Sequence, residues 1–335
     1  MIKKKNGIRK IFICICMCAL FMGALAGCSD GTKVVLTTGF KKNEVFKIGS
    51  ASCTLPEVMV YLTNMQNRYE SIFGEEIWEA AGSGDTLQGE IKEQVLAELA
   101  QIKAMNLLAS EKGTELKGTD EDRVNAAAKE YFASLSDAEK KLLGVDEKLI
   151  TQMYREYATA ARVYEQIVEN VNPEISDDEA RTITVLAIRM ETEEEAREVL
   201  LKALREEADF ETLASTYSED ATITYSFGKG EMEPTIESAA FDLGKNEISN
   251  CVQATTGWYV LKGISTFDEA QTQLNKERIA RERRNEAFNS EYSAFVETLS
   301  RQLNEALWDT VEMLQDEAVV TDRFFEVYNT YFQME

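Results

Sequence analysis

Apolar side chains recur every three or four positions between about residues 55 and 171, the spacing of one face of an α-helix. Two stripes stand out: Ile91, Val95, Leu99, Ile102, Met105 and Ala109, and then Leu149, Met153, Tyr157, Ala160, Tyr164 and Ile167. We expect these stripes to form a helical core rather than a ligand site. The region closes at Pro173, because a helix rarely continues through proline.

The segment "VFKIGSASCTLPEVMVYL" precedes the first stripe and predicts a short strand, a turn and the beginning of a helix. Thr54 suits the N-cap position of that helix, and Pro56 suits its first turn. The negative charge of Glu57 complements the helix dipole.

Residues 176–267 follow a different pattern. The stretch "ARTITVLAIRM" is β-branched and alternates weakly, which predicts a strand, and "EISNCV" and "GWYVLKGIS" predict two more. Between them, "TEEEAREVLLKALREEADFETLASTYS" predicts helix with Leu200, Leu204 and Leu213 facing inward. This part is therefore expected to be a small α/β unit.

A helical pattern returns after this unit. Asp268 is a candidate cap for a long helix toward Leu314, whose apolar stripe would be Phe288, Tyr292, Phe295, Leu299 and Leu303. Such a helix needs a packing partner, and the region before residue 171 is the natural one. The aromatic tail "DRFFEVYNTYF" is expected to dock on the same body.

Composition narrows the range of partners. The length of 335 residues suggests two domains or one inserted in another, and the apolar fraction of 44% is ordinary for a chain that buries a core. The net charge of −23 would repel a phosphate backbone, so nucleic acid is excluded as a partner. The chain has no metal-ligand spacing and no phosphate-binding motif, so we expect no cofactor.

The N-terminus has the pattern of an export signal. Five basic side chains within the first ten residues precede an apolar run from Ile11 to about Leu25, the order of an export signal; an uncleaved anchor is the alternative. The run ends in "LAGC", which resembles the lipobox of bacterial lipoproteins. That resemblance implies lipidation of Cys28 and an extracytoplasmic protein held on the cell membrane. No second long apolar run follows, so we expect the rest to be soluble.

Cysteines beyond the lipid site are few. Cys14, Cys16 and Cys18 lie within the signal, which leaves Cys53 and Cys251. These two could pair outside the cell, but two buried free thiols are the interpretation that we favour.

The segment from Asp209 to Lys262 carries a family pattern: "DFETLASTYSED", then "FGKGEMEPTIESAAFDLGKNEIS", then "GWYVLK". In order and spacing it resembles the parvulin-type prolyl isomerase domain. The layout of helices, inserted unit and helices resembles the extracytoplasmic foldases of the PrsA and SurA type. It implies an α+β protein: a signal peptide (1–27), an anchor and tether (28–45), a helical chaperone-like domain from 46–175 and 268–335, and an inserted parvulin-like domain (176–267).

The resemblance also assigns site residues. Parvulins usually carry two histidines in the cleft, but this chain has no histidine, and Ala187 and Tyr259 stand at the two positions. Asp220 and Thr256 match polar site positions of the family and are taken with Tyr259 as catalytic candidates. The substrate pocket would comprise Met232, Ile236, Phe227 and Phe241. The paired-glycine loop of the family is absent, so the rim is expected to differ.

Each assignment has a structural alternative. Met232, Ile236 and Phe241 are also typical core residues. Asp220 also suits a turn, and Thr256 and Tyr259 are good strand formers.

Three functions compete. The one we favour is a foldase or chaperone for unfolded or newly exported polypeptides, with reduced isomerase activity because both imidazoles are missing. The alternatives are a fully active prolyl isomerase, which the retained Asp220 and Met232 favour, and a surface lipoprotein with a structural role.

Overall fold

The computed structural model describes residues 39–78, 84–172 and 174–332. The predicted signal, the lipobox with Cys28 and most of the tether lie outside these residues. Within the described ranges, no helix combines the length and the apolar character needed to cross a bilayer. The chain divides into two compact units, one comprising residues up to Asn170 together with those from Glu286 onward, and the other Val171–Asn285.

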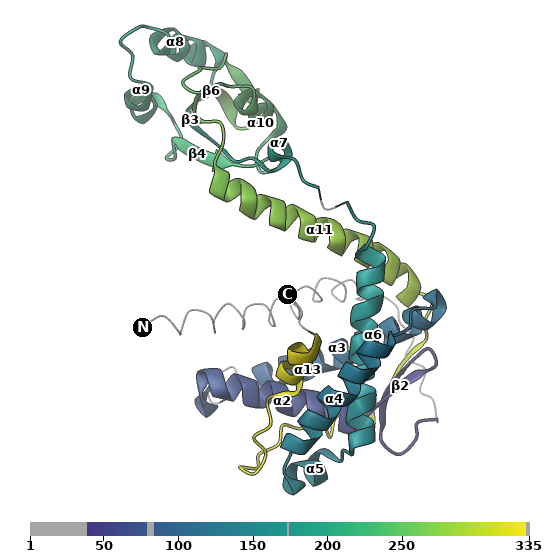
Figure 1. The fold of residues 1–335 in the computed structure, drawn as a ribbon. Coiled ribbons are helices and arrows are strands. Elements are labelled where there is room, and N and C mark those ends of the chain that lie inside the picture. Colours follow the sequence, from purple (N-terminus) through teal and green to yellow (C-terminus); the bar gives the residue numbers. More distant parts are fainter. Residues whose placement is uncertain (1–38, 79–83, 173, 333–335) are drawn as a thin grey trace. The chain divides into compact units, whose positions relative to one another are not determined.

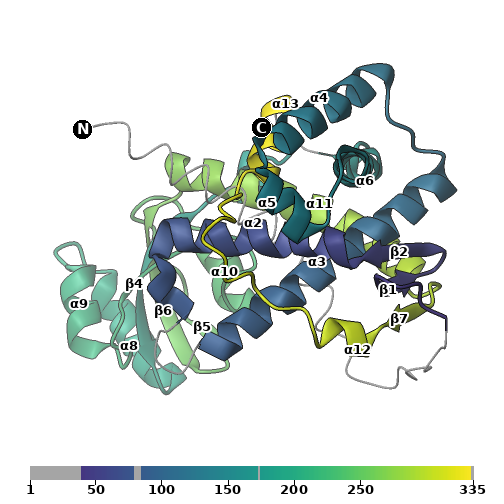
Figure 2. The ribbon, with the colours of Figure 1, turned by 90° about the horizontal axis from the view of Figure 1, so that it is seen from below.

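The first unit is largely helical (Figures 1 and 2). Its helices are α2 (Leu55–Phe73), the short 3-10 helix η2 (Glu75–Trp78), α3 (Gly84–Lys112), α4 (Gly118–Ser134), α5 (Asp137–Leu143), α6 (Glu147–Val168), α12 (Glu305–Trp308) and α13 (Phe324–Phe332). A small antiparallel sheet of order β2-β1-β7 joins β1 (Glu44–Ile48), β2 (Ala51–Thr54) and β7 (Arg301–Leu303). Strands from the N-terminal and C-terminal parts of the sequence therefore pair in one sheet.

Local sequence signals specify this unit well. The stripe predicted from Ile91 to Ala109 lies on α3 and is buried throughout. Thr54 occupies the predicted N-cap position of α2, and its backbone N–H and hydroxyl both donate to Glu57 Oε2 at 2.7 Å. The aromatic tail forms α13, whose Phe324 ring stacks on Tyr154 with centroids 4.4 Å apart.

The chain before α13 is held by polar side chains of the helices. The Gln66 amide donates to Leu314 O at 2.9 Å, and the Asn67 amide donates to Thr321 O at 2.9 Å. In Figure 2 this segment, in yellow, runs beside α2. The carboxylate of Glu139 accepts hydrogen bonds from the backbone N–H groups of Val320 and Thr321. These two donors are therefore satisfied without a strand partner.

A buried charge cluster lies among α2, α3 and α6. Lys103 Nζ is 2.6 Å from Glu57 Oε1 and 2.6 Å from Glu156 Oε2. The side chains of Lys103 and Glu57 are each 3% exposed, while that of Glu156 is 20% exposed. Although burial opposes the charged form of Lys103, the two carboxylates raise its pKa, so the amine stays protonated at neutral pH.

The second unit is a four-stranded antiparallel sheet of order β4-β3-β6-β5 with short helices on both faces. Its elements are α7 (Asp177–Ala180), β3 (Ile183–Met190), α8 (Glu193–Ala203), α9 (Phe210–Tyr217), β4 (Thr224–Phe227), α10 (Pro234–Phe241), β5 (Val252–Ala254) and β6 (Gly257–Ser265). The overall α+β class is therefore confirmed. The first turns of α11 (Glu269–Val296) belong to this unit, where Asn275 donates to Ala180 O at 2.9 Å.

Successive side chains of β3 point to opposite faces of the sheet and contribute to two different apolar clusters. Leu186, Ile188 and Met190 point to the face covered by α8 and α9, whereas Ile183, Val185 and Ala187 point to the face that carries α10. The sheet is therefore buried on both faces near its centre. The second face also carries the cluster of polar groups described below.

Three local expectations are wrong. Leu204 is 61% exposed, because α8 ends at Ala203 and Leu204 is the C-cap residue that follows the helix. The helix after Asp268 ends at Val296 rather than near Leu314, and Leu303 lies in β7, because the free edge of β1 takes Arg301–Leu303 as a strand partner. The segment "EISNCV" contributes an isolated bridge at Ile248 before β5 begins at Val252.

Candidate functional site

The candidate site lies on the α10 face of the second sheet, where β3 and β6 run side by side. Register pairs Ala187 with Leu261 and Arg189 with Tyr259. Ala187, for which the resemblance predicts the place of a family histidine, is buried in the same apolar cluster as Tyr259. The phenol of Tyr259 is 7% exposed and reaches the polar groups at the end of the strand.

Asp220 is the centre of the polar groups. Its Oδ1 accepts from Arg189 Nε at 2.8 Å, while its Oδ2 accepts from the hydroxyls of Tyr225 at 3.3 Å and Tyr259 at 3.4 Å. The loop that carries it is fixed as well, since the Asp220 N–H donates to Ser218 Oγ at 3.3 Å. The carboxylate is thus held by one charge-assisted bond and two long hydrogen bonds.

Thr256 completes the network from the turn between β5 and β6. Its hydroxyl lies 2.8 Å from the hydroxyl of Tyr259, and its carbonyl accepts from Arg189 Nη1 at 2.6 Å. Since Tyr259 donates to Asp220, Thr256 is the donor to Tyr259 in the arrangement that satisfies all three groups. The predicted catalytic candidates Asp220, Tyr259 and Thr256 therefore lie within one hydrogen-bonded chain.

The titration of these groups limits the available chemistry. Partial burial and the Asp220 charge raise the pKa of Tyr225 to about 12, and partial burial also raises the pKa of Tyr259. Both phenols therefore keep their protons at neutral pH and act as hydrogen-bond donors. The hydrogen bond to Asp220 raises the pKa of Arg189, so the guanidinium is a permanent cation. The cluster can orient an amide, but neither the two phenols nor the guanidinium exchanges protons near pH 7 in the manner of histidine.

The predicted pocket residues also gather on this face. Phe227 and Ile236 are buried, and Met232 and Phe241 pack against them at the edge of the same cluster. The rings of Phe227 and Phe241 meet edge to face with centroids 6.0 Å apart. The Arg181 guanidinium lies 4.8 Å above the Phe241 ring, so this aromatic closes the outer end of the cluster.

The rim between α10 and the β5–β6 turn is tied by a carboxylate. Glu233 accepts from the Thr255 N–H at 3.0 Å and from its hydroxyl at 2.7 Å, and these bonds lower the pKa of Glu233. The residue lies directly before α10, next to Met232. The bridge therefore holds the Met232 end of the apolar cluster beside the Thr256 turn.

Sequence reasoning missed Arg189 and Tyr225. The signal was available for Arg189, because alternation along "ITVLAIRM" places it on the same face as Val185 and Ala187, where a charge needs a partner. For Tyr225 the sequence offered no such signal, because its place on this face depends on its pairing with Val185 in the register of β3 and β4.

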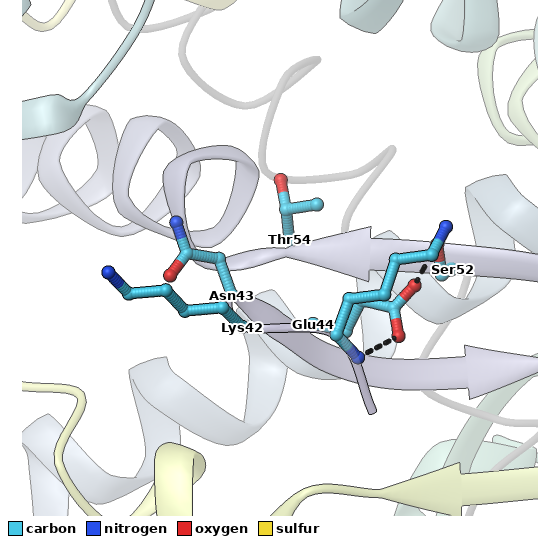
Figure 3. Close-up of a pocket in the computed structure, with 6 residues that line it drawn as sticks. Lys42, Asn43, Glu44, Ser52 and Thr54 are labelled. Atoms are coloured by element: carbon cyan, nitrogen blue, oxygen red, sulfur yellow. Dashed lines mark hydrogen bonds and ion pairs between the residues drawn. The ribbon is translucent and has the colours of Figure 1, made fainter. Parts of the chain in front are cut away.

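A separate hollow lies in the first unit, lined by Lys41, Lys42, Asn43, Glu44, Ser52 and Thr54 (Figure 3). The Glu44 carboxylate accepts from the Lys41 N–H at 2.7 Å and pairs with Lys47 Nζ at 3.1 Å. These bonds satisfy the charge that faces the hollow, so we assign it a role in the β1–β2 hairpin rather than in catalysis.

The two cysteines in the described part of the chain keep their thiols protonated at neutral pH, because burial raises the pKa of both. Cys53 and Cys251 are both free thiols, and burial raises the pKa of Cys53 well above its ordinary value. Among the residues that the structure describes, no three His, Cys, Asp or Glu side chains gather in a way that would hold a metal ion.

Parts of the chain are similar to a known domain family and to known foldases. Residues 178–265 match the model of the rotamase family, the PPIC-type PPIase domain. The foldase protein PrsA of Oceanobacillus iheyensis is 27% identical over 249 residues, which are 68% of this chain and 77% of that protein. PrsA of Halalkalibacterium halodurans is 29% identical over 198 residues, or 53% of this chain and 59% of that protein. The crystal structure of PrsA from Bacillus cereus aligns over 72% of this chain and 92% of that one, with 18% identity and a TM-score of 0.34.

Proposed function

Because the chain is a PrsA-type foldase with a PPIC-type parvulin domain, we propose that it assists the folding of exported polypeptides and that its own isomerase activity is reduced. Rotation about a prolyl bond faces a barrier of ~18–20 kcal/mol. An isomerase lowers it by favouring the twisted amide over the planar one, with an apolar grip on the ring and donors to the carbonyl or nitrogen.

One observation carries the proposal of reduced activity. Asp220, the retained acidic residue, is already engaged by Arg189, Tyr225 and Tyr259, and the chain contains no imidazole. A peptide amide must therefore compete with Asp220 for the Tyr259 hydroxyl. In our proposal Tyr259 donates to the bound amide, while Thr256 donates to Tyr259 and Asp220 orients the phenol.

The proposed proline pocket comprises Met232, Ile236, Phe227 and Phe241. Their shared apolar cluster beside the polar network supports this assignment, because a ring held there would place its amide near the hydroxyls. The same side chains also pack in the core on this face of the sheet.

The helical unit is the proposed client-holding part. We propose that residues 46–175 and 268–335 form one chaperone-like domain and that 176–267 are inserted in it. The grouping of residues up to Asn170 with those from Glu286 supports this division. We further propose that the protein acts outside the cytoplasm, anchored to the membrane through lipid on Cys28. Replacement of Cys28 by Ala should then release the protein from membranes into the soluble fraction.

Restoring the missing groups gives the sharpest test of the isomerase proposal. We expect residues 29–335 to suppress aggregation of an unfolded client while catalysing prolyl exchange in a tetrapeptide slowly, and we expect A187H/Y259H to isomerise faster. Y259F is the matched control that removes only a hydroxyl. Fast exchange by the unaltered chain that D220A abolishes would favour the fully active enzyme instead. Failure to suppress aggregation would refute the chaperone role.

A further inference from the structure

We infer that Arg189 is a positioning residue of the proposed site, one that joins its two rims, the loop 218–220 and the turn at Thr256, and so sets where the hydroxyl donors point. The inference rests on the proposed function of the cleft and adds a residue to it. Arg189 lies near the end of β3, on the face that otherwise carries Ile183, Val185 and Ala187. A guanidinium at an inward position is retained only where its donors find partners.

Every nitrogen of the guanidinium has an acidic or carbonyl partner. Nε donates to Asp220 Oδ1 at 2.8 Å, Nη1 donates to Thr256 O at 2.6 Å, and Nη2 lies 3.5 Å from Glu219 Oε2. The side chain is 21% exposed, so water competes for it only in part. One planar fork therefore spans two segments that are far apart in sequence.

The backbone of Arg189 holds the same loop. Its N–H donates to Ser218 Oγ at 3.2 Å, and its carbonyl accepts from the Glu219 N–H at 3.0 Å. Residues 218–220 are thus tied to one strand position by main chain and side chain together. Arg189 therefore sets the orientation of the loop 218–220, the first rim of the proposed site.

The second rim is shaped to meet the guanidinium. Gly257 has φ +139°, and a Cβ there would lie 2.5 Å from Met190 O and 3.2 Å from Arg189 Nη1. Only glycine lets the turn approach closely enough for the Thr256 carbonyl to accept its bond. The two rims are therefore joined through Arg189.

The consequence for the donors follows from the bond lengths. Arg189 holds Asp220 through the short bond at Oδ1, and the two phenols share Oδ2 through long bonds of 3.3 and 3.4 Å. A bound amide can take the Tyr259 hydroxyl from this weak contact while Asp220 stays in place. Without Arg189 the carboxylate loses its only cationic partner among these bonds, and the positions of both hydroxyls are no longer fixed.

The test compares R189M and R189K with the unaltered chain of residues 29–335. We expect R189M to lower kcat for a prolyl tetrapeptide by about tenfold to a hundredfold with a smaller change in KM, because misplaced donors affect the twisted amide most. R189K, which keeps one charge, should recover part of kcat. R197M is the matched control, since Arg197 pairs with Glu193 on the exposed face of α8.

Hydrogen exchange decides the question independently of activity. Amides of residues 218–220 and 255–257 should exchange faster in R189M but not in R197M, and R189K should restore part of the protection. Unchanged exchange at either rim, or a loss of kcat that R189K does not recover at all, would overturn the inference. If the unaltered chain neither binds nor isomerises the peptide, the proposed cleft function fails, and the exchange data alone decide whether Arg189 joins the rims.

Discussion

Replacement of Lys103 by Met should destabilise the helical unit strongly. The change leaves the Glu57 carboxylate 3% exposed without its cation, and it removes the partner of Glu156, which is 20% exposed. Losing one member of a buried ion pair costs about 3–5 kcal/mol, and we expect the lower end because Glu156 can turn toward water. For a unit of this size, about 3 kcal/mol corresponds to a fall in Tm of about 6–12 °C.

Urea unfolding followed by tryptophan fluorescence measures this loss. Trp78 and Trp308 belong to the helical unit and Trp258 to the other, so a W258F background reports on the helical unit alone. K112M is the matched control, because Lys112 pairs with Glu291 in a partly exposed bridge that should contribute less than about 1 kcal/mol.

A second variant separates lost charge balance from lost packing. E57Q/K103M removes the stranded carboxylate as well as the amine, so it should be more stable than K103M by about 1–2 kcal/mol. The reasoning would be refuted if K103M unfolded within about 1 kcal/mol of its parent, or if the double variant were the less stable of the two.

Other perturbations act on single, well-defined features. Burial raises the pKa of Glu98 from 4.5 to about 7, so the folded chain binds more protons in that window and its unfolding free energy falls by about 3 kcal/mol as pH rises through it. E98Q should flatten this dependence in urea unfolding at pH 5 and pH 8. G257A should destabilise the sheet unit by about 1–3 kcal/mol, followed by Trp258 fluorescence, because its Cβ would meet Met190 O. E139A should cost about 1.5–3 kcal/mol in thermal unfolding, since the Thr321 N–H and its neighbour lose their acceptor.

Each of these changes has a control or a contradicting result. G89A lies in α3 with nothing within 4 Å of the new Cβ and should stabilise by about 0.5–1 kcal/mol. D137A removes an exposed carboxylate from the helix that carries Glu139 and should have little effect. Parallel pH dependences in E98Q and the unaltered chain would contradict the burial argument.

Patterns of short range were enough for much of the fold. The helical stripe of α3 and the Thr54 cap of α2 follow from spacings of three and four residues, and the strand β3 follows from its alternation. The end of α11 did not follow, because residues 301–303 leave the helical pattern to pair with a strand that lies more than 250 positions earlier.

The candidate site divides in the same way. A family pattern in the sequence located Asp220, Tyr259 and Thr256, and the composition alone established that no imidazole is present. The sequence did not indicate which residues bond to Asp220, since Arg189 lies 31 residues away from Asp220 and 67 from Thr256.

The sequence by itself predicted an export signal and the α+β class, and it determined the absence of histidine, because composition, local periodicity and motif order do not depend on contacts between distant residues. Only the tertiary structure decided that one arginine bonds both to Asp220 and to the Thr256 carbonyl and that two phenols share one carboxylate oxygen. Hydrogen bonds depend on distances of about 3 Å between atoms, and these distances exist only after the strands have fixed their register.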